Sequence, residues 1–114
     1  MIRIAICDDE KHMSDHIRAF VSDFFRKKNR EIQLRTFSSG EELLNYDGQI
    51  DILFLDIQMK GMDGLETARK LRAGKFRGFL IFITVLKEMV FQSFEVEPYD
   101  YLVKPVDEKQ FEKT

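Results

Sequence analysis

The sequence has little of what marks secreted, membrane-spanning or nucleic-acid-binding proteins. It holds one cysteine, so no disulfide can form within the chain, which fits a reducing compartment. No stretch approaches the roughly 20 apolar residues needed to cross a bilayer. The first apolar stretch is short and runs into two aspartates, so we expect no signal peptide. The formal charge is only −2, from 18 basic and 20 acidic residues, and gives no electrostatic argument for nucleic acid or membrane. We therefore expect a cytoplasmic protein.

What is present is ordinary for a globular domain. The chain has 114 residues, of which 44% are hydrophobic and 33% are charged. This length suffices for one hydrophobic core and is too short for two. We therefore expect a single domain over residues 1–114.

Strand-like and helix-like segments alternate along the chain. The runs Ile4–Cys7 and Ile52–Leu55 are continuously apolar, which is typical of short strands buried in a parallel sheet. The expected strands are Ile2–Cys7, Ile32–Phe37, Ile52–Leu55, Phe79–Ile83 and Tyr101–Val103. The expected helices run from about Glu10 to Lys28, from a capping box at Ser38-Ser39-Gly40-Glu41 to about Tyr46, from Leu65 to near Gly74, from Glu88 to Phe94, and from Asp107 onward.

This alternation predicts an α/β fold with helices on both faces of a doubly wound, five-stranded parallel sheet. The expected strand order is 2-1-3-4-5, as in flavodoxin-like folds, with the topological switch point between strands one and three. The last helix is cut short after about two turns.

Three acidic residues lie at that switch point. Asp8 and Asp9 follow the first strand, and Asp56 follows the third. An aspartate can simply cap a turn or a helix, but carboxylates rarely end buried strands without compensation of their charge. Ligands of open α/β sheets bind beyond the carboxyl ends of the strands. Together these positions predict a site for a hard cation, best suited to Mg²⁺.

Two further strand ends carry useful groups, Thr84 after the fourth strand and Lys104 after the fifth. Three carboxylates give a charge of −3, which one divalent cation and the Lys104 ammonium balance. The cation, Lys104 and the Thr84 hydroxyl could then hold an incoming phosphoryl group. Asp56 is the natural nucleophile, because it stands alone on the central strand while Asp8 and Asp9 form a pair.

These residues match a known family in four motifs, which occur in the family's order and spacing. The motifs are Cys7-Asp8-Asp9-Glu10, Leu55-Asp56-Ile57-Gln58-Met59 with Met62-Asp63-Gly64, Thr84 after an apolar strand, and Asp100-Tyr101-Leu102-Val103-Lys104-Pro105. Over essentially its full length the chain resembles the receiver domain of two-component response regulators. The resemblance implies that Asp56 accepts a phosphoryl group from a sensor histidine kinase. It also implies that this protein catalyses only its own phosphorylation and dephosphorylation.

The resemblance also implies roles for the neighbouring residues. Asp9 and Asp56 would bind Mg²⁺ directly with the backbone carbonyl of Gln58, and Asp8 would help, often through water. Thr84 and Lys104 would contact the phosphoryl group.

Tyr101 is implied to be the aromatic switch residue. It would turn when Thr84 moves towards the phosphoryl oxygens, and so change the surface formed by the fourth helix, the fifth strand and the fifth helix. That surface would form a homodimer or release an output domain. The Lys104–Pro105 bond is implied to be cis, and X-Pro is where a cis peptide costs least.

Within the family, Ile4–Glu10 and Phe94–Leu102 look most like receivers of regulators whose output is a LytTR-type DNA-binding domain. No such output domain is present, so the chain is expected to be a receiver alone, with no direct nucleic-acid or membrane binding. Two positions depart from the common pattern. Val85 is larger than the small residue usual after the threonine, and Lys60 replaces a common proline.

Two other functions remain open on the same fold. A Mg²⁺-dependent phosphohydrolase of the haloacid dehalogenase type would also form an aspartyl-phosphate, but it needs a second acid where this chain has Gln58. A receiver-like interaction module that works without phosphorylation is the other alternative, because a fold does not fix a function. Elsewhere, we expect His12 and His16 to be surface residues and Cys7 to be a small buried hydrophobe.

Overall fold

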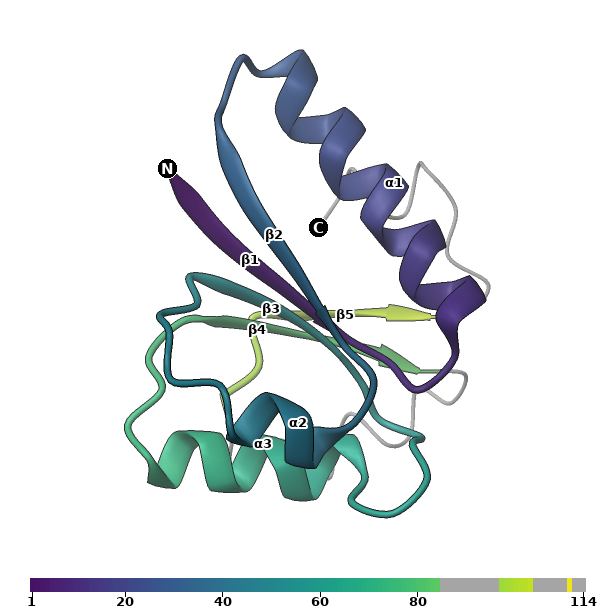
Figure 1. The fold of residues 1–114 in the computed structure, drawn as a ribbon, viewed down its shortest axis with the longest axis vertical. Coiled ribbons are helices and arrows are strands. Elements are labelled where there is room, and N and C mark those ends of the chain that lie inside the picture. Colours follow the sequence, from purple (N-terminus) through teal and green to yellow (C-terminus); the bar gives the residue numbers. More distant parts are fainter. Residues whose placement is uncertain (85–96, 104–110, 112–114) are drawn as a thin grey trace.

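The computed structural model describes residues 1–84, 97–103 and 111, and shows a parallel sheet with helices on both faces (Figure 1). The strands are β1 (Ile2–Cys7), β2 (Ile32–Phe37), β3 (Ile52–Asp56), β4 (Phe79–Thr84) and β5 (Asp100–Val103). The helices are α1 (Lys11–Lys27), α2 (Gly40–Leu44) and α3 (Gly64–Ala73). Among the helices of these residues, none combines the length and the apolar character that crossing a bilayer requires.

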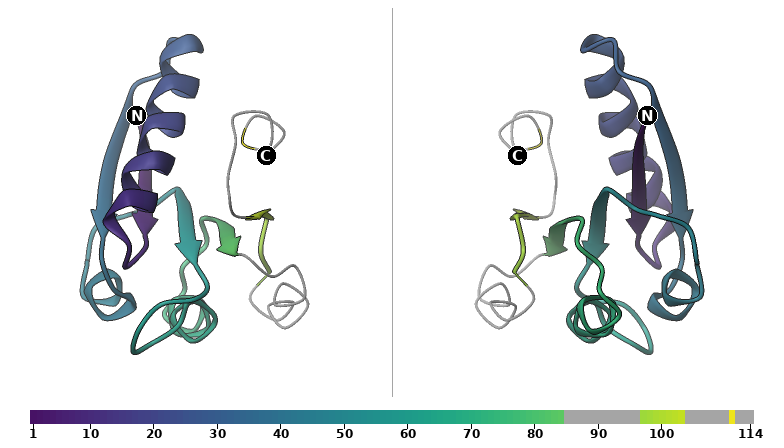
Figure 2. Two further views of the ribbon diagram at one scale, coloured as in Figure 1. Left: turned by 90° about the vertical axis from the view of Figure 1, so that its right-hand side faces the viewer. Right: turned by 90° about the vertical axis from the view of Figure 1, so that its left-hand side faces the viewer.

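The strand order confirms the expected arrangement 2-1-3-4. β1 pairs in parallel with β2 and β3, and β3 pairs in parallel with β4. β5 runs parallel along the outer side of β4. Because all these strands point the same way, their carboxyl ends meet at one edge, which faces the viewer in the left panel of Figure 2. The helix expected at Glu88–Phe94 lies outside the described residues, and so does the helix expected from Asp107 onward, apart from Phe111.

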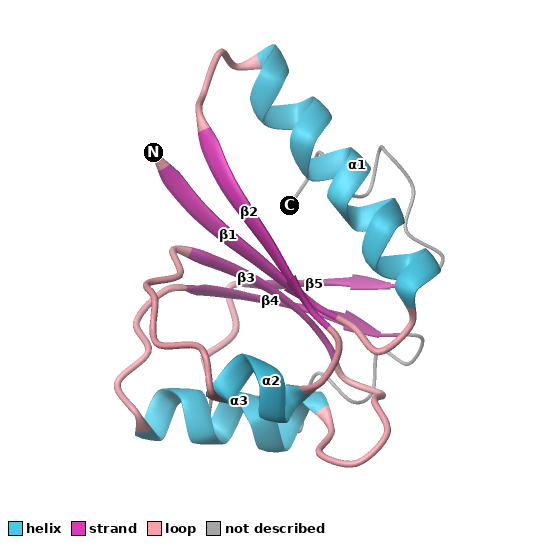
Figure 3. Ribbon diagram, viewed as in Figure 1, coloured by secondary structure: helices cyan, strands magenta, loops and turns pink. Residues whose placement is uncertain are grey.

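Two apolar clusters fill the spaces between the sheet and its helices. On one face, Ile17 and Val21 of α1 are fully buried against β1, β3 and β4. On the other face, Leu43 of α2 and Leu65 and Ala68 of α3 pack against the same strands (Figure 3). This division explains the continuous apolar runs of the central strands, because both of their faces are covered.

Sequence patterns predicted most element boundaries to within a residue or two. The short second helix differs at both ends, because it begins one residue later and ends about two residues earlier than expected. Its N-cap is Ser39, whose side chain accepts a hydrogen bond from the Glu42 backbone N–H at 3.0 Å. The Ser38 hydroxyl instead donates to the Glu42 carboxylate at 3.0 Å. The N-cap is therefore Ser39 rather than Ser38, and the helix ends at Leu44 rather than near Tyr46.

The backbone at the start of α3 lies very close to the end of β3. A Cβ atom added to Gly64 would lie 2.2 Å from the Asp56 carbonyl oxygen and 2.7 Å from the Ile57 Cα. Any side chain at this position would therefore have to push the two backbones apart. By contrast, a Cβ on Gly74, at the other end of α3, would meet its nearest atoms at an ordinary 3.5 Å.

Cys7 ends β1 with its side chain buried in the cluster beneath α2 and α3, as expected for a small hydrophobe. Burial first, and then the negative charges of nearby carboxylates, Asp8 foremost, raise the pKa of the Cys7 thiol to about 12. The histidines of α1, His12 and His16, are both exposed, as expected.

We predict that Gly64→Ala destabilises the protein, because the added methyl group must displace the backbone beside Asp56. The expected loss is about 1–3 kcal/mol of the free energy of unfolding, measured by urea denaturation. Gly74→Ala is the matched control. Its backbone conformation (φ −83°) suits alanine, so we expect no loss or a gain of about 0.4–1 kcal/mol. Equal losses in both variants would contradict the proposed close approach at Gly64.

We predict that the Cys7 thiol reacts very slowly in the native protein. A thiol with a pKa near 12 is ionised at pH 8 about a thousandfold less than an unfolded cysteine with a pKa near 8.5, and only the thiolate reacts. Alkylation followed by mass spectrometry, with and without urea, measures the ratio.

The same shift predicts a pH dependence of stability. Because the native state binds the Cys7 proton more tightly than the unfolded state, its contribution is complete below about pH 8.5 and is lost as pH rises towards 12. Cys7→Ala should remove that part of the alkaline loss of stability. An unchanged alkaline profile in the variant would contradict the assignment.

Candidate metal and phosphoryl site

The parallel pairing of β1 with β3 brings three aspartates together at the carboxyl edge of the sheet. Asp8, Asp9 and Asp56 each offer a carboxylate oxygen, and these oxygens all lie within 4.8 Å of one another. Asp8 and Asp56 are buried, with 2% and 1% of their surface exposed, whereas Asp9 is open to solvent. The structure therefore gathers the three acids that the sequence singled out, and gives them one side open to an incoming ligand.

Asp8 is held at the turn between β1 and α1. Its backbone N–H donates to the Phe37 carbonyl oxygen at 3.0 Å, which extends the pairing of β1 with β2 by one residue. Its Oδ1 atom accepts a hydrogen bond from the Glu10 backbone N–H at 2.9 Å. The turn-forming role that an aspartate can take is thus present at Asp8, together with its place in the acidic cluster.

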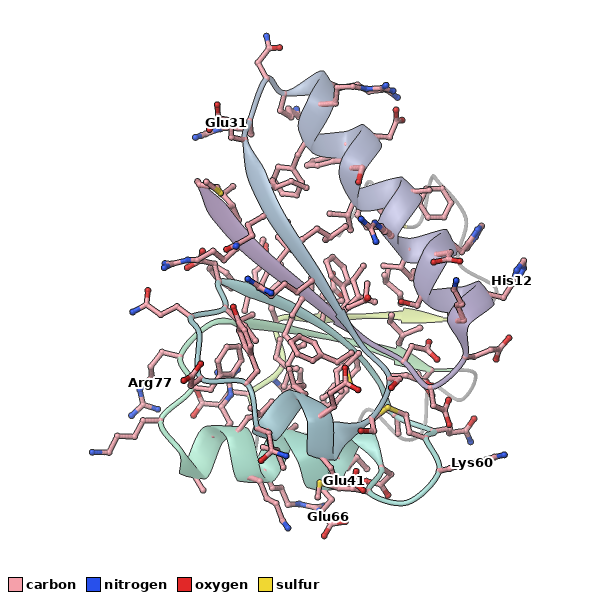
Figure 4. All side chains as sticks on the ribbon, in the orientation of Figure 1. His12, Glu31, Glu41, Lys60, Glu66 and Arg77 are labelled. Carbon is pink, nitrogen blue, oxygen red and sulfur yellow. The ribbon has the colours of Figure 1, made fainter. Side chains whose placement is uncertain are left out.

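Asp9 links two loops that are far apart in sequence. Its Oδ2 atom accepts a hydrogen bond from the backbone N–H of Lys60 at 2.9 Å, across 51 residues. The loop after β3 is therefore tied to the loop after β1. The side chain of Lys60 is exposed and extends away from the ribbon into solvent (Figure 4). Lys60 thus contributes to the site through its backbone.

Asp56 is held in position by hydrogen bonds of the backbone that follows it. Its Oδ1 atom accepts a hydrogen bond from the Gln58 N–H at 3.3 Å. The next residue, Ile57, donates its N–H to the Ile83 carbonyl of β4 at 3.0 Å and accepts one from the Gly64 N–H at 2.8 Å. Together with the close approach of Gly64, these bonds fix the loop that carries the carboxylate.

The oxygen donors of this cluster suit a small hard cation. An octahedral Mg²⁺ ion with bonds of about 2.0–2.1 Å holds its ligand atoms about 2.9–4.2 Å apart. The observed span of 4.8 Å or less needs only a small contraction to reach this range. The negative charge of the cluster also affects the neighbouring Cys7. Burial is the largest cause of the raised pKa of its thiol, and Asp8, Asp56 and Asp9 each raise that pKa as well.

The remaining predicted site residues are only partly described. Thr84 ends β4 as a fully buried residue, directly after Ile83, the neighbour of Asp56 in the sheet. Tyr101 lies in β5 opposite Phe82, but the structure does not describe its side chain. Lys104, the Lys104–Pro105 bond and Val85 lie outside the described residues.

One supporting residue was not assigned a role from sequence. Asp63 caps α3, accepting a hydrogen bond from the Glu66 N–H at 2.9 Å, and its carbonyl oxygen accepts the Thr67 hydroxyl at 2.8 Å. The sequence does contain a signal for this cap, because an aspartate followed by a glycine and an apolar residue commonly marks the start of a helix. This cap fixes the first turn of α3, where Gly64 meets the loop of Asp56.

Comparisons with known proteins agree with this arrangement. Residues 4–114 match the family model of the response regulator receiver domain. The chain is 34% identical over 115 residues to the transcriptional regulatory protein BtsR of Escherichia coli, and 29% identical over 116 residues to the sensory transduction protein LytT of Bacillus subtilis. It is matched over its full length but covers only 46% of each of these relatives.

A solved structure supports the same assignment. The receiver domain of AraT, a response regulator from Geobacillus stearothermophilus, has a TM-score of 0.81 and 28% identity. The match covers 98% of this chain and 88% of the AraT chain. The fold, the family model and the full-length likeness to both regulators lead to one conclusion: the chain belongs to the receiver domain family of two-component response regulators.

Proposed function

We propose that this protein is a phosphorylation switch in which Asp56 accepts a phosphoryl group from a sensor histidine kinase. The observation that carries the proposal is the carboxylate cluster of Asp8, Asp9 and Asp56, in a chain of the receiver family. Asp56 is the nucleophile because it is buried at the end of the central strand, where bonds from Gln58 and Gly64 fix its loop. Attachment to such a fixed loop orients the carboxylate before the phosphoryl donor arrives.

The proposed transfer forms one bond and breaks one. An Asp56 carboxylate oxygen attacks phosphorus, and the P–N bond to the kinase histidine breaks as the new O–P bond forms. The imidazole keeps the bonding electron pair and takes up a proton. Asp9 and Asp56, the Gln58 carbonyl and, through water, Asp8 would hold Mg²⁺, which supplies positive charge to the phosphoryl oxygens.

Thr84 and Lys104 are proposed to contact the phosphoryl group, and Tyr101 to respond to it. The buried position of Thr84 at the end of β4, next to the strand that carries Asp56, supports the first role. We further propose that β5 completes the receiver sheet in the order 2-1-3-4-5. The phosphoryl group then favours one of two arrangements of the surface around β5. The size of this shift is set by how much more strongly the phosphoryl group interacts with one arrangement than with the other.

The output is proposed to lie outside this chain. Because the chain covers 46% of both LytT and BtsR, we propose that the receiver, residues 1–114, is followed by a LytTR-type DNA-binding domain in a cytoplasmic transcription regulator. The surface around β5 would form the homodimer or release that domain. The receiver itself would bind neither DNA nor membrane, and would catalyse only its own phosphorylation and dephosphorylation.

We predict that acetyl phosphate with Mg²⁺ adds one phosphoryl group to the protein, and that Asp56→Asn abolishes the adduct. Intact-protein mass spectrometry shows the added mass, and neutral hydroxylamine should remove it, as it does an acyl phosphate. Asp47→Asn is the matched control, because this carboxylate is exposed in a loop away from the cluster. Release of phosphate over many turnovers would favour a phosphohydrolase, and the absence of any adduct would favour an interaction module.

We predict that Asp9→Asn raises the melting temperature of the metal-free protein and lowers its affinity for Mg²⁺. The amide keeps an oxygen to accept the Lys60 N–H but removes one of three repelling charges, so the melting temperature without metal should rise. Mg²⁺ affinity should fall more than tenfold, since charges about 4 Å apart near a protein surface interact by about 4 kcal/mol. Calorimetric titration measures the affinity. Mg²⁺ affinity equal to that of the unaltered protein would remove Asp9 from the ligand set.

A further inference from the structure

The edge of the sheet opposite the carboxylate cluster carries a groove that the proposed function does not use. It measures about 690 Å³ and lies between the loop before β3 and the turn between α3 and β4. Apolar side chains, including Leu43, Ile50 and Leu71, contribute to its lining. A second hollow of about 400 Å³ adjoins it, and the two share Arg77, Gly78 and Phe79.

Two exposed aromatic rings stand beside this groove. Phe79 at the start of β4 and Tyr99 before β5 leave 58% and 59% of their surface exposed. Their rings pack edge to face, with centroids 5.0 Å apart. Within the described ranges Met1 is the one other large hydrophobic residue with such exposure. Paired aromatic rings left in water are typical of a contact surface.

The side chain of Arg72 holds the turn that carries this surface. The Arg72 guanidinium donates hydrogen bonds to the carbonyl oxygens of Phe76 and Gly78, both at 3.0 Å, and of Glu97 at 3.1 Å. Its guanidinium also lies 5.0 Å from the centre of the Phe76 ring. Arg72 thus fastens the segment before β4 to the segment before β5. A surface held in this way loses little conformational freedom on binding.

The charges around the groove favour an anion. Lys75 and Arg77 are exposed, and in the described part of the chain neither has an ion-pair partner. Lys70 adds a third cation to the lining, although it lies 4.0 Å from Glu66. Asp51, the acid in the larger groove, is already bonded to Arg3 at 3.1 Å. Among the charged residues that line the two hollows, four are basic (Lys70, Arg72, Lys75 and Arg77) and two are acidic (Asp51 and Glu97), so positive charge is in excess there.

We propose that the amino-edge patch, formed by Lys75, Arg77, Phe79 and Tyr99 with the groove beside them, docks an acidic protein segment that carries aromatic side chains. An aromatic side chain of the partner would pack on the Phe79–Tyr99 pair and extend towards the apolar lining. Its carboxylates would face Lys75 and Arg77. A protein partner suits the patch better than nucleic acid, because a phosphate backbone gains little from an apolar groove.

The patch is separate from the carboxylate cluster. Figure 4 shows Arg77 and Lys60 on opposite sides of the molecule, with α2 and α3 between them. β3 connects the two edges and has five residues, a length of roughly 15 Å at about 3.3 Å per residue. Docking at the patch should therefore be unaffected by Asp56→Asn, and a failure of one proposal would leave the other standing.

The test uses a peptide of alternating aspartate and phenylalanine residues, titrated into isotope-labelled protein and followed by amide chemical shifts. We expect the largest shifts between residues 74 and 80 and at Tyr99, with weaker binding at higher salt. Arg77→Glu and Phe79→Ser should each lower the affinity about tenfold. Arg30→Glu is the matched control, since this exposed arginine lies in the turn after α1, and it should leave the affinity within about twofold.

Four results would overturn the proposal. They are the absence of shifts at millimolar peptide, equal binding of a lysine-phenylalanine peptide, tighter binding of a short DNA duplex, or an equal loss of affinity in Arg30→Glu and Arg77→Glu. An absence of shifts would show that the patch does not bind such segments. Equal binding of the lysine-phenylalanine peptide, or equal losses in the two arginine variants, would show that charge at the patch does not select the partner. Tighter binding of DNA would show that the surface suits nucleic acid better than protein.

Discussion

Asp8 and Asp56, two carboxylates almost without contact with solvent, end neighbouring strands, and the proximity of these two acids is the constraint on which the site depends. Burying one charge costs several kcal/mol unless it is compensated, and parallel pairing of β1 with β3 leaves the two groups no way to separate. When both carboxylates are ionised, their repulsion adds to this cost. A cation bound there would relieve that cost, which links ion binding directly to stability.

Backbone groups help to hold all three carboxylates in place. Backbone N–H groups of Glu10, Lys60 and Gln58 each donate to one of them. Such donors fix positions and orientations but supply no net charge. These bonds give the site a fixed geometry, and three carboxylate oxygens held in this way suit a small divalent ion.

The sequence allowed the acidic cluster to be predicted because its geometry follows from topology. Once Ile4–Cys7 and Ile52–Leu55 are recognised as neighbouring parallel strands, Asp8 and Asp56 must end at the same edge. The capping of α2 could not be predicted to the residue, since Ser38-Ser39 and Glu41-Glu42 offer two equivalent registers. Only the packing of the chain chooses between them.

Features that depend on the path of the backbone could not be predicted from the sequence, for a different reason. The bond from the Lys60 N–H to Asp9 depends on the path of a loop, and any residue except proline could supply the donor. The amino-edge patch was missed because its parts come from separate turns and follow no recognised motif. A hint was nevertheless present, in the alternation of basic and aromatic residues along Lys75-Phe76-Arg77-Gly78-Phe79.

The opposite characters of the two sheet edges have a consequence for how this protein meets others. Its net charge is close to zero, yet in the described part of the chain Asp8, Asp9 and Asp56 lie at one end of the strands and Lys75 and Arg77 at the other, so these groups contribute a dipole along the sheet. An approaching charged surface exerts a torque on such a molecule before the two touch. A positively charged partner and a negatively charged partner would therefore approach opposite ends of the same domain, and each would orient the domain before contact.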